Sequence, residues 1–297
     1  MILFRLEAKI FSREKRGRSV IAAAAYRAGS RLKDEIKEKI YDYTRRSKGV
    51  LETTVLAPEG APAWVRDPAQ LWNLVESGEK RVDAQLAREF ILAVPRELDR
   101  QVQFQTAVEW AQRELVASGM VAEVSLHHTR TGRNPHVHIL TTMRRLDGDK
   151  FSSKKATEWN DVALLVKQRE SWASAVNAAL EKAGCAERVD HRSLKARGVD
   201  RTPEPKIGPT GTAMKRRGED SERFQQFREV KLMNEIKPML KAIQKTGEVG
   251  QKGMGSTWWE KSVVFMKRVR EQTHSVVQKT WQSVVQSRRD TPSEPTR

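Results

Sequence analysis

The stretch VAEVSLHHTRTGRNPHVHILTTMR, residues 121–144, decides the fold because it contains two β-strands and the turn between them. Apolar and polar residues alternate in VAEVSLHH (121–128) and in HVHILTTMR (136–144), which is the period of a strand. The intervening TRTGRNP (129–135) is rich in residues that form turns. The stretch therefore predicts an antiparallel hairpin.

Four of the six histidines lie within this hairpin. His136 and His138 are two residues apart on a strand, so both side chains leave the same face. His128 ends the preceding strand, and an antiparallel hairpin closed by the loop 129–135 puts it opposite His136. His127 then points to the other face. Strand parity favours His128 as the partner of the other two, although a shifted register would exchange its role with that of His127.

Three neutral imidazoles, from His128, His136 and His138, make a candidate site for a divalent metal ion. Such a site keeps coordination positions open for water or substrate, as catalytic sites do. Histidine ligands alone favour Zn²⁺, whereas chemistry on phosphate esters favours the harder ions Mg²⁺ and Mn²⁺. The alternative is a polar hairpin whose histidines are solvated, and the spacing leaves it open.

The rest of the chain surrounds this hairpin with further strands and helices. Strands are predicted at 2–11, 52–58 and 87–95, and helices at 19–29, 71–81, 102–119 and 160–184. In the first of these helices, Ser19 is a suitable N-cap and Gly29 a suitable stop. The order of the elements predicts an α+β fold with a largely antiparallel central sheet and helices packed on it.

The character of the chain changes after about residue 190, where apolar periodicity is lost and basic residues are frequent. We place the domain edge near residue 218. The region 219–297 is predicted to be basic and mainly helical, with a disordered tail at 288–297. A helix there could contact a partner or a membrane, or pack on the first domain, and the sequence leaves these alternatives open.

The formal net charge of +17 suits binding to a polyanion such as DNA, RNA or an anionic membrane surface. The alternative is a protein that is merely basic. No apolar run is long enough to cross a membrane, and the first residues lack the pattern of a signal peptide. Cys185 is the only cysteine, so an internal disulfide is excluded, which fits a reducing cytoplasm.

Tyr26 lies in the predicted helix, within IAAAAYRAG (21–29), among alanines too small to cover it. Such small neighbours allow a bulky substrate, for example a DNA backbone, to approach closely. A phenol is a poor nucleophile unless a base, a cation or a metal-bound substrate assists it. A half-buried structural tyrosine has the same surroundings, so its neighbours alone leave its role open.

Four segments resemble, in the same order, the MobA/MobL family of plasmid mobilization relaxases, a branch of the HUH endonucleases. They are SVIAAAAYRAGSRL (19–32), AQLAREFILAVP (84–95), HHTRTGRNPHVHILTT (127–142) and DHRSLKARGVDRTPEPKIGP (190–209). The third is the most specific, because it combines a histidine with a second pair eight and ten residues later. The resemblance covers roughly residues 1–218 and implies a relaxase domain with the α+β sheet described above.

The resemblance implies a DNA relaxase that nicks one strand at a plasmid origin of transfer and later religates it, which initiates conjugative mobilization. Tyr26 matches the nucleophile of the family, which forms a 5′-phosphotyrosyl bond and leaves a free 3′ hydroxyl. His128, His136 and His138 match the three ligands of a divalent metal ion, Mg²⁺ or Mn²⁺ with Zn²⁺ as an alternative.

Glu89 matches a carboxylate that the family has near this site. It is expected either to orient a histidine ligand or to help take the proton of the tyrosine. The alternative is a glutamate at a strand edge that faces water. Many relatives carry a second acid two residues later, where this chain has Ile91. A mechanism that needs two carboxylates is therefore in doubt here.

Arginines close to the matched segments are expected to contact DNA phosphates. These are Arg27, Arg130, Arg133, Arg192 and Arg197. Further basic residues at 13–18 and 45–48 flank the tyrosine helix. Trp64, Trp72 and Trp159 are candidate stacking platforms for bases. Glu76 and Glu79 are interpreted as solvated charges on their helix.

The resemblance also implies partners and a location. The expected partners are single-stranded and duplex origin DNA, relaxosome accessory proteins and the coupling apparatus of a type IV secretion system, without stable membrane insertion. The expected location is the bacterial cytoplasm, with transfer to the recipient cell while bound to DNA. Two alternatives are a rolling-circle replication initiator, disfavoured because Tyr26 precedes the histidines, and a non-catalytic relaxosome component, disfavoured because tyrosine and histidines are retained.

Overall fold

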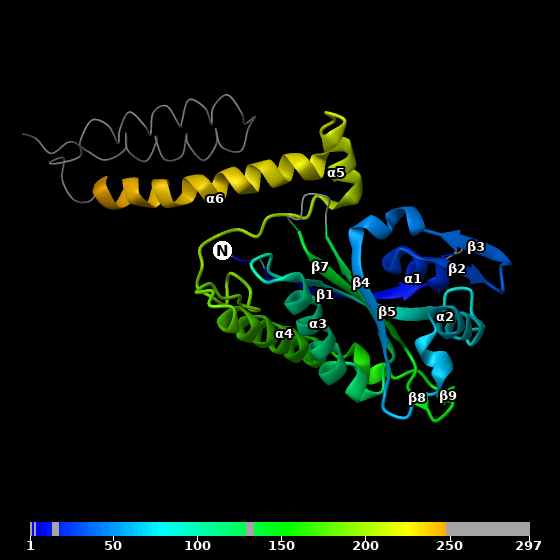
Figure 1. Cartoon of the computed structure of the whole chain (residues 1–297). Coiled ribbons are helices and arrows are strands. Elements are labelled where there is room, and N and C mark those ends of the chain that lie inside the picture. The colour runs from blue at the N-terminus through cyan, green and yellow to red at the C-terminus, as the bar shows by residue number, and fades with distance from the viewer. Residues whose placement is uncertain (1, 3, 14–17, 129–133, 248–297) are drawn as a thin grey trace, which may run out of the picture. The chain divides into compact units, whose positions relative to one another are not determined.

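The computed structural model describes residues 2, 4–13, 18–128 and 134–247 (Figure 1). Its contacts divide the chain into two units, Met1–His191 and Arg192–Arg297. The sequence placed the domain edge near residue 218. In the structure the segment 192–218 instead groups with the second unit. The arrangement into domains 1–218 and 219–297 stays a prediction.

The first unit is built on a five-stranded sheet of order β1-β5-β7-β6-β4, in which every neighbouring pair is antiparallel. Its strands are β1 (Leu6–Ser12), β4 (Val50–Leu56), β5 (Gln85–Ala93), β6 (Ala122–His127) and β7 (His136–Thr142). Together with the helices packed on it, this sheet confirms the α+β class.

Helices cover both faces of the sheet (Figure 1). On one face, α3 (Arg100–Glu114) and α4 (Val162–Lys182) enclose a core with the apolar residues of the central strands. On the other face, α1 (Val20–Ala28) and α2 (Pro68–Ser77) form a second core. Because β5 is covered on both sides, seven of its nine residues are buried, with no alternation of exposed positions.

Several short elements were missed by the sequence prediction. They are the hairpin β2 (Arg31–Asp34) and β3 (Lys39–Asp42), the hairpin β8 (Leu146–Asp147) and β9 (Lys150–Phe151), and the 3₁₀ turns η1 (Thr44–Gly49), η2 (Ala63–Arg66), η3 (Val116–Ser118) and η4 (Thr157–Asn160). The first hairpin was missed because its four-residue strands are mostly charged and exposed, so they lack an apolar period.

The second unit contains α5 (Gly208–Arg216) and α6 (Glu222–Gly247). The helix expected from about Ser221 is confirmed as α6. The proposed contact helix beyond Gly247 and the tail 288–297 lie outside the described residues. Within the part of the chain that the structure describes, no helix combines the length and apolarity that a membrane span needs.

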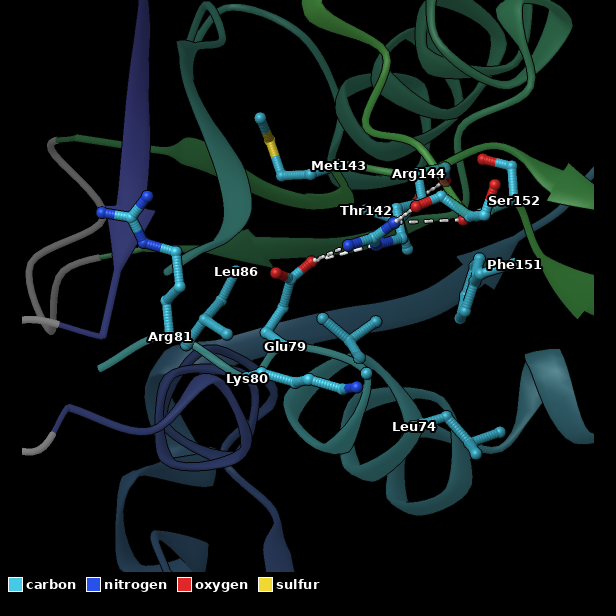
Figure 2. A pocket seen from close by; sticks show the side chains of 13 residues that line it. Leu74, Glu79, Lys80, Arg81, Leu86, Thr142, Met143, Arg144, Phe151 and Ser152 are labelled. Atoms are coloured by element: carbon cyan, nitrogen blue, oxygen red, sulfur yellow. Dashed lines mark hydrogen bonds and ion pairs between the residues drawn. The ribbon is translucent and has the colours of Figure 1, made fainter. Parts of the chain in front are cut away.

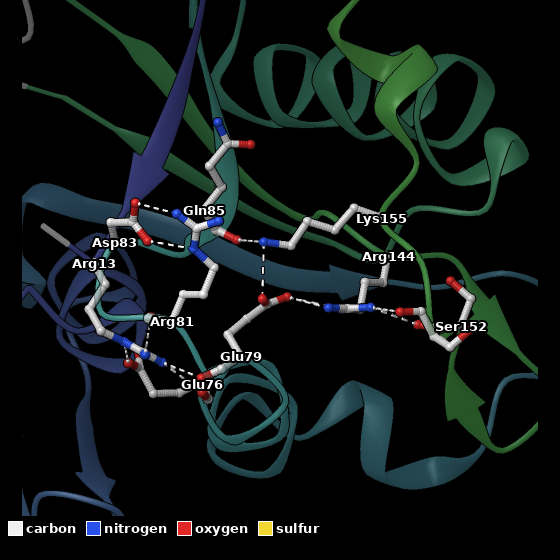
Figure 3. Close-up of polar contacts among 10 residues, drawn as sticks. Arg13, Glu76, Glu79, Arg81, Asp83, Gln85, Arg144, Ser152 and Lys155 are labelled. Carbon is white, nitrogen blue, oxygen red and sulfur yellow. Dashed lines mark hydrogen bonds and ion pairs between the residues drawn. The ribbon is translucent and has the colours of Figure 1, made fainter.

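Helix α1, which carries Tyr26, is anchored at its N-terminus by buried polar groups. Ser19 caps the helix and donates its hydroxyl to Asp34, with an Oγ to Oδ2 distance of 2.7 Å. The backbone N–H of Val20 donates to Glu76 Oε2 at 3.0 Å, and Arg13 Nε donates to Glu76 Oε1 at 2.8 Å (Figure 3). Glu76 is 2% exposed, so the interpretation of this residue as a solvated charge is wrong.

The other end of α1 depends on Gly29. This residue adopts the left-handed conformation, with φ at 61°, and a Cβ added there would lie 3.0 Å from Ser47 Cα and Val50 Cγ2. The turn η1 therefore packs directly on the end of the helix. We expect Gly29→Ala to lower the free energy of unfolding by about 1–2 kcal/mol through backbone strain, and by about 1–3 kcal/mol more through overpacking.

Urea unfolding measures this loss, and Gly60→Ala is its matched control. Gly60 has φ at 74°, but no atom lies within 4 Å of its added Cβ. The control variant has the backbone strain without the overpacking, so its free energy of unfolding should fall by only about 1–2 kcal/mol. Equal losses in the two variants would contradict a tight contact between α1 and η1.

Glu123 is a buried carboxyl group on β6, 2% exposed. The indole N–H of Trp72 donates to its Oε2, whereas its Oε1 has no hydrogen-bond partner among the described residues. Burial raises the pKa of Glu123 to about 7, against the lowering effects of the Trp72 hydrogen bond and of the positive charge on Arg27. The folded protein therefore binds this proton more tightly than the unfolded chain does.

The raised pKa predicts how Glu123→Gln changes stability with pH. As pH rises from 4.5, the ordinary value, through about 7, wild type should lose the stability that the protonated group provides. The stability of the variant relative to wild type should therefore grow by about 3 kcal/mol between pH 4.5 and pH 8. Urea unfolding at both pH values tests this, with the exposed Glu59→Gln as control; a pH-independent difference would contradict the raised pKa.

Candidate active site

Three histidines converge where β6 and β7 begin to separate. In the register of the two strands His127 pairs with His136, and Ser125 pairs with His138. His127, His136 and His138 therefore share one face of the sheet, and their ligand atoms all lie within 4.8 Å of one another. The ring centroids are 4.9–5.6 Å apart. This spacing is short enough for one ion to be bound by all three imidazoles.

The sequence prediction that His128 lies opposite His136 is wrong. The register is shifted by one residue, so that eight residues, 128–135, separate the paired His127 and His136. A shift of one residue moves every side chain of a strand to the other face. The backbone N–H of His128 instead donates to Gly49 O at 3.1 Å.

The error came from assuming that the histidines share the apolar face of their strand. Val124 and Leu126 point into the core beneath α3 and α4, together with Val137. Because the sheet is buried on both faces, the polar face of this hairpin is an inner face too. Val137, which separates His136 from His138, was a usable signal: the histidine face of β7 is opposite to its apolar face.

The donor set fits a divalent metal ion, because each imidazole is held through one ring nitrogen among the residues that the structure describes. Nε2 of His127 lies 2.5 Å from Arg27 O, and Nδ1 of His136 lies 2.8 Å from Asn134 O. Nδ1 of His138 lies 2.7 Å from Glu89 Oε1. Carbonyl and carboxylate oxygens only accept, so these nitrogens carry the hydrogen and the opposite nitrogen of each neutral ring has a lone pair.

The electrostatics favour the neutral form of two of the three histidines. Burial, with the nearby His138, lowers the pKa of His127 to about 4. Burial likewise lowers the pKa of His136. Neutral imidazole is the form that binds metal, so at neutral pH no proton has to be removed from these two rings first.

Glu89 lies on β5 beside the cluster and is buried. Its Oε1 accepts from His138 Nδ1 at 2.7 Å and from Arg27 Nε at 2.8 Å. Burial alone would raise its pKa, but the two hydrogen bonds and the charge of Arg27 outweigh burial and lower the pKa to about 2. Such a weak base favours the orienting role over proton removal.

The last turn of α1 is bonded directly to the histidine cluster through Arg27. The backbone carbonyl of Arg27 accepts from His127. The guanidinium of Arg27 donates to Glu89 through Nε and to Ala23 O through Nη1, the latter at 2.7 Å. The role of Arg27 as a DNA contact stays a prediction, and these bonds add a second role. They tie the residue that follows Tyr26 in the chain to the cluster.

Two residues hold the ring of Tyr26, which remains 39% exposed. The Cζ of Arg46 lies over the ring, 4.4 Å from its centroid. Tyr43 meets the same ring edge to face, with centroids 5.4 Å apart. Both residues belong to the segment 43–50, which packs closely against Gly29 at the end of α1. The sequence singled out Arg46 only as one of several basic residues, because nothing local indicates this contact.

The other predicted DNA contacts are not tested by this geometry. Arg130 and Arg133 lie outside the described residues. Arg192 and Arg197 belong to the second unit. Their role as phosphate contacts stays a prediction.

Comparison with known proteins shows the family of this chain. Residues 18–217 match the sequence model of the MobA/MobL family. Mobilization protein MobL of Acidithiobacillus ferridurans is 36% identical over 260 residues, which cover 76% of this chain and 68% of that protein. Probable mobilization protein MobA of Bifidobacterium longum is 30% identical over 278 residues, 80% of this chain and 48% of that protein. The chain thus spans about two thirds of the first relative and about half of the second.

One solved structure is similar in sequence as well as in fold. It is a chain from work on the molecular basis of vancomycin resistance transfer in Staphylococcus aureus. Its sequence identity is 30% and its TM-score 0.60, and the match covers 65% of this chain and all of that one. The fold is therefore shared with a protein from a study of resistance transfer.

Proposed function

The chain belongs to the MobA/MobL family, and from this premise we propose that it is a relaxase that nicks one DNA strand at a plasmid origin of transfer. The observation that carries the proposal is a pair of hydrogen bonds that Arg27 makes. Its backbone carbonyl accepts from His127, and its guanidinium donates to Glu89, which in turn is bonded to His138. This contact holds Tyr26, the neighbouring residue, beside a group of donors suited to a metal ion and a phosphate.

In the proposed reaction the phenolic oxygen of Tyr26 attacks the scissile phosphorus. The new bond joins the tyrosine to the 5′ phosphate, and the bond from phosphorus to the 3′ oxygen breaks. The phenol loses its proton to solvent and the departing oxygen gains one, so a free 3′ hydroxyl results. The reverse transesterification religates the strand without an external energy source, because the phosphodiester energy is kept in the phosphotyrosyl bond.

The protein residues position the reacting groups. Arg46 and Tyr43 hold the ring of Tyr26 from its face and its edge. Glu89 orients His138 through a hydrogen bond, which also makes the opposite ring nitrogen a better ligand. Arg46 is exposed and lies next to the nucleophile, so its guanidinium is suited to receive the phosphate.

We assign the metal ligands to His127, His136 and His138. A divalent ion held there would polarise the scissile phosphate and offset the charge that grows on its oxygens. Three nitrogen donors suit Mn²⁺ or Zn²⁺ better than Mg²⁺, which prefers oxygen ligands.

The test is formation of a covalent complex. The protein is incubated with single-stranded DNA from the transfer origin and Mn²⁺, Mg²⁺ or Zn²⁺, then separated under denaturing conditions. A band of protein bound to the 5′ end of the downstream fragment of the cleaved strand is expected, and a chelator should prevent it. Cleavage without any covalent intermediate would exclude the proposed chemistry.

The partners and the setting follow from the same proposal. The relatives named as mobilization proteins support origin DNA as the substrate, single-stranded at the nick and duplex around it. Relaxosome accessory proteins and a type IV secretion coupling apparatus are the proposed protein partners. The proposed location is the bacterial cytoplasm, with passage to the recipient on the DNA.

A further inference from the structure

A pocket of about 500 Å³ lies far from the histidine cluster, at the other end of β7 (Figure 2). It is enclosed by the end of α2 with the residues after it, by the residues 142–144 at the end of β7, and by Phe151, Ser152 and Ser153 at the second hairpin. From His136 to Thr142 the strand rises by about 20 Å, at roughly 3.3 Å per residue. The pocket is therefore separate from the catalytic cluster.

The central feature of the pocket is the guanidinium of Arg144. Its Nε donates to Glu79 Oε1 at 3.0 Å, and its Nη1 donates to Ser152 O at 3.3 Å and also to Ser153 O. Its Nη2 lies 2.9 Å from the same Glu79 oxygen as an ion pair. These contacts engage all three nitrogens of the guanidinium at its edge, so less of the edge is left for a phosphate, whereas stacking of a planar group uses the flat face.

The partners of Arg144 are themselves fixed (Figure 3). Glu79 Oε2 is 3.1 Å from Lys155 Nζ, which also donates to Gln85 O at 2.6 Å. The interpretation of Glu79 as a solvated charge is therefore wrong, because its carboxylate holds two cations in place. A guanidinium held this rigidly is a preformed platform for a planar group.

The other lining residues complete the chemistry of a nucleotide site. Leu74, Val75, Leu86 and Phe151 provide apolar walls beside the platform. Lys80 lines the same pocket, is exposed, and makes no ion pair with any residue that the structure describes. Apolar walls, one flat cation face and one available ammonium group suit a base with its phosphate.

Two of the three tryptophans that the sequence suggested as platforms cannot take this part. Trp72 and Trp159 are 0% and 2% exposed, so no base can reach them, and that expectation is wrong for both. Trp64 packs edge to face on Phe151, with centroids 5.6 Å apart, and supports the wall of the pocket from behind. Arg144 offers the stacking face that these indoles do not.

We infer that this pocket binds a base of single-stranded DNA, stacked on the face of Arg144, with Lys80 contacting a neighbouring phosphate. The inference rests on the proposed function, because it makes the pocket a second contact with the same strand that Tyr26 cuts. At about 3.4 Å per nucleotide, 20 Å corresponds to about six stacked nucleotides between the two sites.

The test uses photocrosslinking to an oligodeoxythymidylate in which some positions carry 5-iododeoxyuridine. Its length of about 30 nucleotides exceeds the usual site size of a single-strand binding fold. The full chain is irradiated and the crosslinked peptides are identified by mass spectrometry. We expect a crosslink within residues 142–153, with Phe151 as the nearest aromatic acceptor. Crosslinks confined to segments that do not line the pocket would overturn the inference. Complete suppression of the crosslinks by free deoxythymidine monophosphate at a concentration equal to that of the oligonucleotide would overturn it too.

Two variants test the assignment by affinity, measured as fluorescence anisotropy with the same oligonucleotide. Arg144→Lys keeps the charge and the ion pair with Glu79 but removes the flat face, and should weaken binding about 10-fold. Leu74→Asp places a negative charge at an exposed wall position and should weaken it similarly. Val82→Asp, an equal charge change at a residue that is 75% exposed and does not line the pocket, is the control.

The outcomes separate this inference from the proposed function. Arg144→Lys and Leu74→Asp, at saturating DNA, should still form the Tyr26 adduct, since neither residue lies in the catalytic cluster. An adduct in wild type with unchanged affinity of both variants would overturn the pocket assignment alone. Weakened binding and the expected crosslink without any adduct in wild type would overturn the relaxase proposal and leave the pocket as a DNA site. Thermal unfolding of each variant confirms that affinity is compared between folded proteins.

Discussion

Tyr26→Phe is expected to abolish the covalent protein–DNA complex while DNA binding is retained. The substitution removes only the phenolic oxygen, and the ring still fills the space between Arg46 and Tyr43. Without the oxygen no phosphotyrosyl bond can form, so the rate of covalent cleavage should fall by a factor on the order of 1,000 or more. Denaturing electrophoresis with labelled origin DNA measures the adduct, and anisotropy measures binding.

The matched control is Tyr43→Phe, since Tyr43 touches the same ring from a neighbouring element. This variant should keep the adduct, with a rate within about 10-fold of wild type, because it loses a hydroxyl but no edge contact. An adduct that persists in Tyr26→Phe, or one that is lost only in Tyr43→Phe, would show that Tyr26 is not the nucleophile.

The second large effect concerns which of two adjacent histidines binds the metal. His127→Ala is expected to weaken Mn²⁺ binding and to slow adduct formation by at least about 100-fold, since one of three ligands is lost. His128→Ala should change both by less than about 3-fold, because His128 is not in the histidine cluster and its bond to Gly49 O is made by the backbone N–H. Titration calorimetry with Mn²⁺ measures the first effect without any requirement for activity.

The pair of variants is its own control, because both remove one imidazole from adjacent positions. His136→Ala should match His127→Ala in metal affinity, since the two rings face each other across β6 and β7. A large loss of Mn²⁺ affinity in His128→Ala, with His127→Ala unaffected, would require the register of the hairpin to shift by one residue when metal binds.

Local sequence was sufficient to predict the helix that carries Tyr26 and the strands that carry Glu89 and the histidines. The cap at Ser19, the small residues of the helix and the left-handed stop at Gly29 define α1, and the observed helix runs between these two residues. The pairing of His136 with His138 on one face follows from the two-residue period of a strand. These features depend on neighbours in the chain, so the sequence carries them directly.

The relative position of β6 and β7 is not a local property. Both strands have apolar and polar faces, and both faces are buried, one under α3 and α4 and the other beneath α1. Burial therefore does not tell which face carries the site, and a loop length that differs by one residue exchanges His127 with His128. Only the packing of all five strands and both helical layers selected His127.

The polar contacts of the candidate sites are decided in the same way. Glu76 and Glu79 look like surface charges of the predicted helix 71–81, yet each is held by an arginine distant in sequence, Arg13 and Arg144. The sequence by itself determined the strands of the central sheet, the longer helices including the one that carries Tyr26, and two of three histidines, because these follow from periodicity and capping over a few residues. The third histidine, the contact of Arg46 with Tyr26 and the platform at Arg144 required the tertiary structure, because they join residues whose proximity arises only when the two cores form.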